Sequence, residues 1–129
     1  MIKLNAVHHI AVICSDYEVS KKFYVDILGF AVVAEHYREK RNSYKLDLKL
    51  GDQYCVELFS FPAPPPRPSR PEACGLRHLA FEVTNIDEAI LWLTKNNITT
   101  EPIRTDEFTG KRFTFFEDPD ALPLELYER

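Results

Sequence analysis

Cysteine is scarce in this sequence of 129 residues. The three cysteines, Cys14, Cys55 and Cys74, are widely spaced and odd in number, and no two of them form a C-x-x-C pair. This spacing argues against a structural zinc site, a redox dithiol or a disulfide framework. We therefore expect three free thiols, as is typical of proteins in a reducing compartment.

Long apolar runs and an excess of positive charge are also absent. The N-terminal segment MIKLNAVHHIAVICSD is too short and too polar to span a membrane, and it lacks a signal-peptide cleavage site. The formal net charge of −4 argues against a nucleic-acid backbone as partner. We therefore expect a soluble cytoplasmic protein that binds neither membranes nor nucleic acids.

Proline, in contrast, is concentrated in one place. Six of the nine prolines fall within residues 62–71, in the stretch FPAPPPRPSRP, which favours an extended conformation over a helix or an internal strand. This stretch divides the chain into two halves. The length fits one compact domain, so we expect a single domain over residues 1–129 with module one at 1–60, a proline-rich linker at 61–74 and module two at 75–129.

The two halves have the same predicted order of elements. Each begins with a short strand, residues 7–14 or 76–83, that leads to a helix-capping residue and a helix with apolar residues at helical spacing, 17–28 or 86–97. Three strand-like runs follow in each half: residues 30–37, 43–50 and 53–61 in the first, and 98–104, 111–117 and 122–128 in the second. The prediction is an α+β fold of two β-α-β-β-β modules.

Four polar residues occupy matched positions in these modules. His9 and His78 belong to the first strands, Glu57 and Glu125 to the last, and the two His-to-Glu separations are 48 and 47 residues. Apolar neighbours flank both glutamates, so both carboxylates are expected on the face away from the helices. Unpaired carboxylates there would be costly, and a divalent ion shared with two imidazoles would satisfy them.

Taken singly, each residue has a simpler interpretation. A histidine in a strand is more often structural than a ligand, and a lone glutamate is more often a solvated surface group. The matched set of four favours a shared metal site instead. His8 should point to the opposite face from His9 and be structural, and His36 should be exposed.

At these residues the chain resembles the vicinal oxygen chelate superfamily, which includes glyoxalase I, extradiol dioxygenases and fosfomycin-resistance proteins. The motifs HHIAVICSDYEVSKKFYVDILGF, CVELF, GLRHLAFEV and FTFFEDPDALPLELYE carry the resemblance over nearly the whole chain. It implies paired β-α-β-β-β modules around one divalent ion, either Ni, Co, Zn, Mn or Fe, held by His9, Glu57, His78 and Glu125. A ligand set of two His and two Glu is most similar to that of bacterial glyoxalase I.

The resemblance implies an enzyme, a lyase or isomerase that acts on an α-oxo or thiol-adduct small molecule through a metal-bound enediolate. Glu125 or Glu57 would be the general base, with Glu125 favoured. Ile13 stands where glyoxalase I has the arginine that grips glutathione, which argues against glutathione as the thiol. Ala121 replaces the glycine of the usual D-P-D-G turn. A ring-cleaving dioxygenase and a non-enzymatic binding or resistance protein remain alternatives.

Partners follow from the same residues. Basic side chains could bind an anionic small-molecule substrate, although each is also an ordinary surface charge: Arg67, Arg70, Arg77, Arg104, Lys111 and Arg112. Because each module supplies half of the metal ligands and leaves sheet edges open, we also expect a homodimer.

Overall fold

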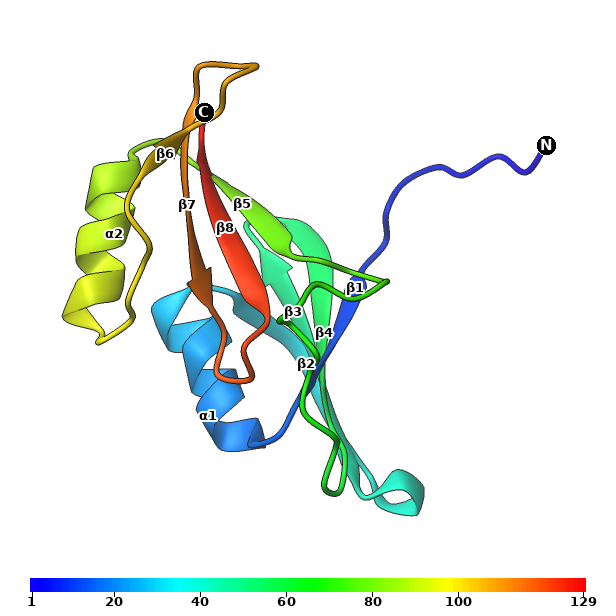
Figure 1. Cartoon of the computed structure of the whole chain (residues 1–129). Helices are drawn as coiled ribbons and strands as arrows, with labels where there is room; N and C mark the ends of the chain where they lie inside the picture. Colours follow the sequence, from blue (N-terminus) through cyan, green and yellow to red (C-terminus); the bar gives the residue numbers. More distant parts are fainter. The chain divides into compact units, whose positions relative to one another are not determined.

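The chain folds into two compact units. The computed structural model describes residues 1–129. Unit 1 is Met1–Pro65 and unit 2 is Pro66–Arg129, so the boundary lies inside the proline-rich stretch. Each unit contains one four-stranded sheet and one main helix (Figure 1). This confirms the predicted α+β fold of two β-α-β-β-β modules. Neither main helix is long and apolar enough to cross a membrane.

Unit 1 follows the predicted order of elements. Its elements are β1 (Ile10–Cys14), α1 (Tyr17–Lys22), the π-helical turn η1 (Phe23–Ile27), β2 (Ala31–Arg38), the 3-10 turn η2 (Glu39–Arg41), β3 (Ser43–Leu50) and β4 (Gln53–Ser60). The strand order is β1-β4-β3-β2, with β1 parallel to β4 and the other pairs antiparallel. The Asp16 side chain caps α1 by accepting a hydrogen bond from the Val19 amide.

Unit 2 repeats this arrangement. Its elements are β5 (Leu79–Val83), α2 (Ile86–Lys95), β6 (Arg104–Thr105), β7 (Arg112–Glu117) and β8 (Pro123–Glu128). The strand order is β5-β8-β7-β6, again with the first and last strands of the module parallel. Asn85 caps α2 through the Glu88 amide, and the chain leaves the helix at Asn97, whose φ of 61° is left-handed.

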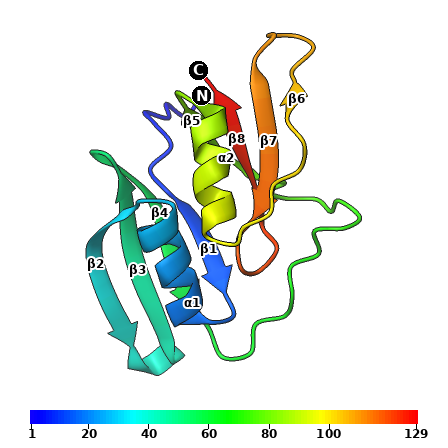
Figure 2. The ribbon, with the colours of Figure 1, turned by 90° about the vertical axis from the view of Figure 1, so that its left-hand side faces the viewer.

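One face of each sheet packs against its own helix, as Figure 2 shows. Alternate strand residues supply the apolar core. In unit 1 they include Leu46, Leu48, Val56 and Leu58, and in unit 2 Phe116, Leu124 and Leu126, with Ile86 and Leu93 from α2. Since strand side chains alternate, the residues between these positions lie on the other face, and Glu57 and Glu125 are among them.

Three strand predictions were wrong in extent. The predicted strand at 98–104 is reduced to β6, Arg104–Thr105. Pro102 cannot donate a ladder hydrogen bond, and before it the backbone of Glu101 bonds to the Phe115 carbonyl and to the Thr114 hydroxyl of β7. The first strand of each module also begins later than predicted. His9 immediately precedes β1 and His78 immediately precedes β5, so neither histidine lies within a strand.

Candidate metal centre

The first His–Glu pair lies in unit 1. His9 Nε2 is 3.3 Å from Glu57 Oε2. Glu57 lies in the middle of β4, between Ala11 of β1 and Asp47 of β3. The small Ala11 side chain leaves room beside the carboxylate for the imidazole. Only 8% of the Glu57 surface is exposed, so this carboxylate depends on its polar neighbours for stability.

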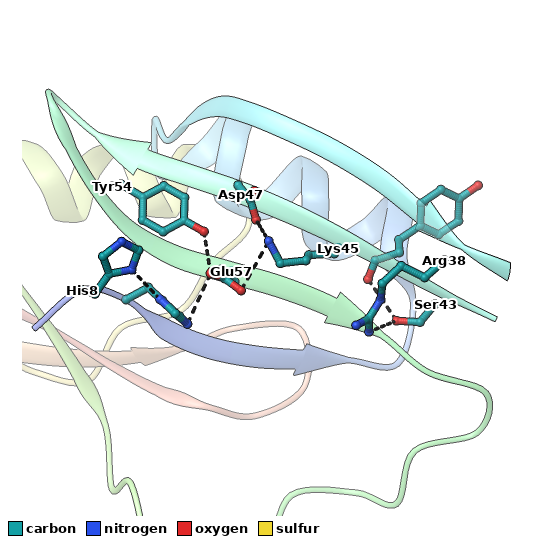
Figure 3. A network of polar contacts seen from close by, with 9 residues as sticks. His8, Arg38, Ser43, Lys45, Asp47, Tyr54 and Glu57 are labelled. Atoms are coloured by element: carbon teal, nitrogen blue, oxygen red, sulfur yellow. Dashed lines mark hydrogen bonds and ion pairs between the residues drawn. The ribbon is translucent and has the colours of Figure 1, made fainter. Parts of the chain in front are cut away.

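Tyr54 and Lys45 also hold this carboxylate, and Asp47 in turn holds Lys45, as Figure 3 shows. The Tyr54 hydroxyl donates to Glu57 Oε2 at 2.5 Å. Lys45 Nζ lies 3.5 Å from Glu57 Oε1 and 2.5 Å from Asp47 Oδ1. Burial, reinforced by the bond to Glu57, raises the pKa of Tyr54, so its hydroxyl remains a donor at neutral pH. The bond to Asp47 raises the pKa of Lys45, which remains charged.

Lys45, Asp47 and Tyr54 were not predicted from the sequence, although the pattern of β3 contains a signal for two of them. In β3, Lys45 and Asp47 alternate with the buried Leu46 and Leu48, which places both polar side chains on the Glu57 face. Tyr54 carries no such signal. A β-bulge between Leu48 and Lys49 changes the pairing of β3 with the start of β4, and strand alternation alone does not predict its contact with Glu57.

His8 lies against His9, which corrects the expectation that it would point away. The two Nδ1 atoms are 2.8 Å apart, and the His8 ring centroid is 5.2 Å from that of Tyr54. Both histidines precede β1, so strand alternation does not apply to them. A hydrogen bond between two Nδ1 atoms requires a proton on only one of them. With that proton on His9, its Nε2 presents a lone pair, which is the form of imidazole that ligates metals.

The second His–Glu pair lies in unit 2 and has different surroundings. His78 Nε2 is 3.0 Å from Glu125 Oε2, and Glu125 is 9% exposed. Glu125 lies between Ala80 of β5 and Phe115 of β7. The Phe115 ring meets the His78 ring edge-on at 5.0 Å. Phe115 thus takes the position that Asp47 has in unit 1, and His78 is the one polar side chain paired with Glu125 within the unit.

The donor atoms in both pairs fit a divalent ion. With metal–ligand bonds of about 2.0–2.1 Å, two ligands of one ion lie about 2.9–3.4 Å apart in octahedral or tetrahedral geometry. The separations of 3.3 and 3.0 Å agree with that range. Neither unit alone gathers three or more His, Cys, Asp or Glu side chains into a metal-holding group. A site made of all four residues needs both units and stays a prediction.

The basic residues predicted to bind an anionic substrate separate into two groups. Arg67, Arg70, Arg77 and Arg104 line one cavity together with His78. Arg112 and Lys111 lie outside this cavity. Arg112 pairs with Glu128 and with Asp87 of α2, and Lys111 is exposed.

Ile13 is exposed and pairs with Phe59 in the sheet, and His36 is exposed as expected. The three cysteines are free thiols.

Known proteins match this chain over nearly its full length. The model of the Glyoxalase/Bleomycin resistance protein/Dioxygenase superfamily matches residues 6–126. The chain is 66% identical over 126 residues to the uncharacterized protein YwkD of Bacillus subtilis, covering 98% of both chains. It is 64% identical over 129 residues to the uncharacterized protein YaeR of Escherichia coli, covering 100% of both. A crystal structure of a glyoxalase family protein from Enterococcus faecalis is 54% identical, with a TM-score of 0.89 over 95% of this chain and 97% of that one.

More distant matches carry functional names. The metallothiol transferase FosB of Staphylococcus saprophyticus is 25% identical over 96% of this chain and 77% of its own length. The trypanothione-dependent glyoxalase I of Leishmania major is 23% identical, with a TM-score of 0.74 over 97% of this chain and 87% of that one. At this level of identity the second match shows a shared fold.

Proposed function

The chain belongs to the Glyoxalase/Bleomycin resistance protein/Dioxygenase superfamily, and we propose that it is a glyoxalase I-like metal-dependent lyase or isomerase. Its substrate is an α-oxo compound or thiol adduct of low molecular weight. One divalent ion is held by His9, Glu57, His78 and Glu125. The observation that carries this proposal is the repeated His–Glu pair, with separations of 3.3 and 3.0 Å next to equivalent strands of two similar units.

A divalent ion in this site would supply Lewis-acid stabilisation for negative charge on substrate oxygens. The chain's own residues supply the proton transfer. Tyr54 and Lys45 hold both oxygens of Glu57, which suits a fixed ligand. His78 alone holds Glu125. Glu125 is therefore the carboxylate with freedom to turn towards the substrate, take a proton from the carbon alpha to a carbonyl and return it to the neighbouring carbon.

We propose that the thiol part of the substrate is a small thiol other than glutathione. Ile13 offers no positive charge at the position expected to grip the glutathione carboxylate. A charge-assisted hydrogen bond of that kind contributes about 1.5–3 kcal/mol, so its loss weakens binding roughly ten- to a hundredfold. We expect adducts of other small thiols to be turned over more efficiently than the glutathione adduct.

Turnover of methylglyoxal adducts with a panel of thiols tests the reaction. In the full-length, metal-loaded protein, Glu125→Gln should lower kcat by roughly a hundredfold or more, the usual contribution of a general base. Glu57→Gln should lose bound metal and activity together, and Glu117→Gln, an exposed glutamate at the end of β7, should keep both. Failure of the metal-loaded wild type to turn over any adduct would contradict the proposal, as would a full rate in Glu125→Gln.

A further inference from the structure

Unit 2 contains a cavity that is lined by the proposed metal ligand His78 and otherwise by residues outside the proposed metal site. Its volume is about 90 Å³, several times the ~10–15 Å³ that a single water molecule requires. The proline-rich segment forms one wall, and Phe115 of β7 with Pro123 of β8 contributes to the other. In Figure 2 this segment is the green stretch between β4 and β5, which has no helix or strand of its own.

The charged residues of this cavity give it an excess of positive charge. They are four arginines and two glutamates: Arg67, Arg70, Arg77, Arg104, Glu72 and Glu101. With His78 neutral, the formal charge of the lining is +2, whereas the whole chain carries −4. An anionic group of a ligand would offset that local excess.

Arg70 of the proline-rich segment and Arg77, which follows it, share one acidic partner. Glu72 Oε1 is 3.9 Å from Arg70 Nη1 and 3.5 Å from Arg77 Nη2. Arg67 has no carboxylate partner in the unit. Its guanidinium donates to the Leu76 carbonyl at 2.5 Å and to Ser69 Oγ at 3.0 Å. These bonds hold the segment in place while the charge of Arg67 stays uncompensated.

Arg104 supplies the fourth positive charge from the sheet side. Its guanidinium carbon is 4.9 Å from the centroid of the Phe113 ring and 5.4 Å from that of Phe115, and it pairs with Glu101 at 2.6 Å. The aromatic stacking fixes the orientation of the guanidinium plane. Phe115 also contacts the His78 ring, so the cavity lies directly next to one half of the candidate metal centre.

We propose that this arginine-lined cavity binds the oxyanion end, a carboxylate or phosphoryl group, of the substrate. The identification of that ligand as the substrate rests on the proposed function, whereas the anion site rests on the cavity and its charges. Planar guanidinium groups match both oxyanions with paired hydrogen bonds. The substrate class is therefore a small anion, with its charged end beside His78 and its reacting atoms at the metal site.

Titrations of the full-length protein with inorganic phosphate and with acetate test the site, with ionic strength kept constant by chloride. The amide resonances of the non-proline residues of 67–78 and of Arg104 should shift and saturate. Arg77→Gln and Arg104→Gln should each weaken binding roughly three- to tenfold, less than for a buried contact because 68% and 55% of these side chains are exposed. Glu72→Gln should tighten it by a similar factor, and Arg129→Gln, outside the cavity, should change nothing.

The same titrations separate this site from the metal centre. His9→Ala removes a proposed metal ligand in unit 1, and phosphate binding should persist in that variant even when metal is lost. Tighter binding of phosphate than of acetate would identify a phosphoryl group, and the reverse a carboxylate. The absence of a saturable shift would overturn the anion site, as would affinities for Arg77→Gln and Arg104→Gln equal to that of Arg129→Gln. If the metal-loaded wild type binds phosphate but turns over no adduct, the proposed reaction is overturned and the anion site still stands.

Discussion

Glu57 and Glu125 have equivalent places in the two units but different neighbours. Strand alternation predicted from the sequence that both carboxylates lie away from the helices, and their flanking residues Val56 and Leu124 are indeed buried. The sequence could not predict how each carboxylate is held. The contact between Tyr54 and Glu57 depends on a β-bulge, and the contact between His8 and His9 depends on where β1 begins.

Tyr54→Phe tests the support of Glu57. The change removes one short hydrogen bond to a carboxylate oxygen and leaves the ring in place. Loss of such a contact behind a metal ligand typically lowers metal affinity roughly ten- to a hundredfold. Competition with a chelator measures the affinity. Tyr127→Phe is the matched control, since the Tyr127 hydroxyl bonds to Asp106 and Thr109 instead, and equal affinities in the two variants would contradict this role.

At the scale of elements, the sequence located both helices and most strands because their apolar periodicity is clear. It failed at residues 98–103, where a β-branched run suggested a strand and Pro102 interrupts the ladder. It also gave no sign of the π-helical turn η1, since one extra residue in a turn leaves the apolar pattern nearly unchanged.

The turn between β7 and β8 contains a strained residue. Ala121, which replaces the glycine of the family's usual turn, has a φ of 64°. This conformation costs a non-glycine residue about 1–2 kcal/mol in the folded state. Glycine avoids that cost, but its greater conformational entropy in the unfolded state offsets about 0.4–1 kcal/mol of the gain. Ala121→Gly should therefore raise the free energy of unfolding by up to about 1.6 kcal/mol.

Urea denaturation measures that change. Ala121 forms its hydrogen bonds through backbone atoms: its carbonyl accepts from Ser69 Oγ and its amide donates to the Asp118 carbonyl, so glycine retains both. Ala89→Gly, the same substitution inside α2, should lower the free energy of unfolding by about 1 kcal/mol. Destabilisation in both variants would show that the turn is not strained.

The hydrogen bonds that join α1 to Glu35 of β2 should make a pH-dependent contribution to stability. Hydrogen bonds from Lys21, at 2.7 Å, and from Tyr17 lower the pKa of Glu35. A carboxyl group with a lowered folded-state pKa stabilises the fold above its unfolded pKa of about 4.3, and this contribution disappears as pH falls through the folded value. The difference in unfolding free energy between wild type and Glu35→Gln should therefore shrink below about pH 4. A difference that stays constant from pH 6 to pH 3 would contradict this assignment.

At the scale of the whole molecule, each unit carries half of the proposed ligand set. Unit 1 supplies His9 and Glu57, and unit 2 supplies His78 and Glu125. The matched spacing in the sequence predicted these two pairs. Sequence spacing contains no information on whether a unit combines with the other unit of its own chain or with that of a second copy.

We predict a homodimer in solution. Each four-stranded sheet leaves two edge strands, β1 and β2 in unit 1 and β5 and β6 in unit 2, and open edges favour association. Light scattering at micromolar concentration should give twice the 15.0 kDa of one chain. A mass of one chain with metal still bound would show that a single chain builds the whole site.

The metal content of matched histidine variants tests the central claim most directly. The full-length wild type, purified and loaded with a divalent ion, should carry one equivalent per chain. His9→Ala and His78→Ala should both lose it, because each removes one ligand of the same ion, whereas His36→Ala, which changes an exposed histidine of β2, should keep it. Retention of a full equivalent by either His9→Ala or His78→Ala would contradict a site shared by the two units.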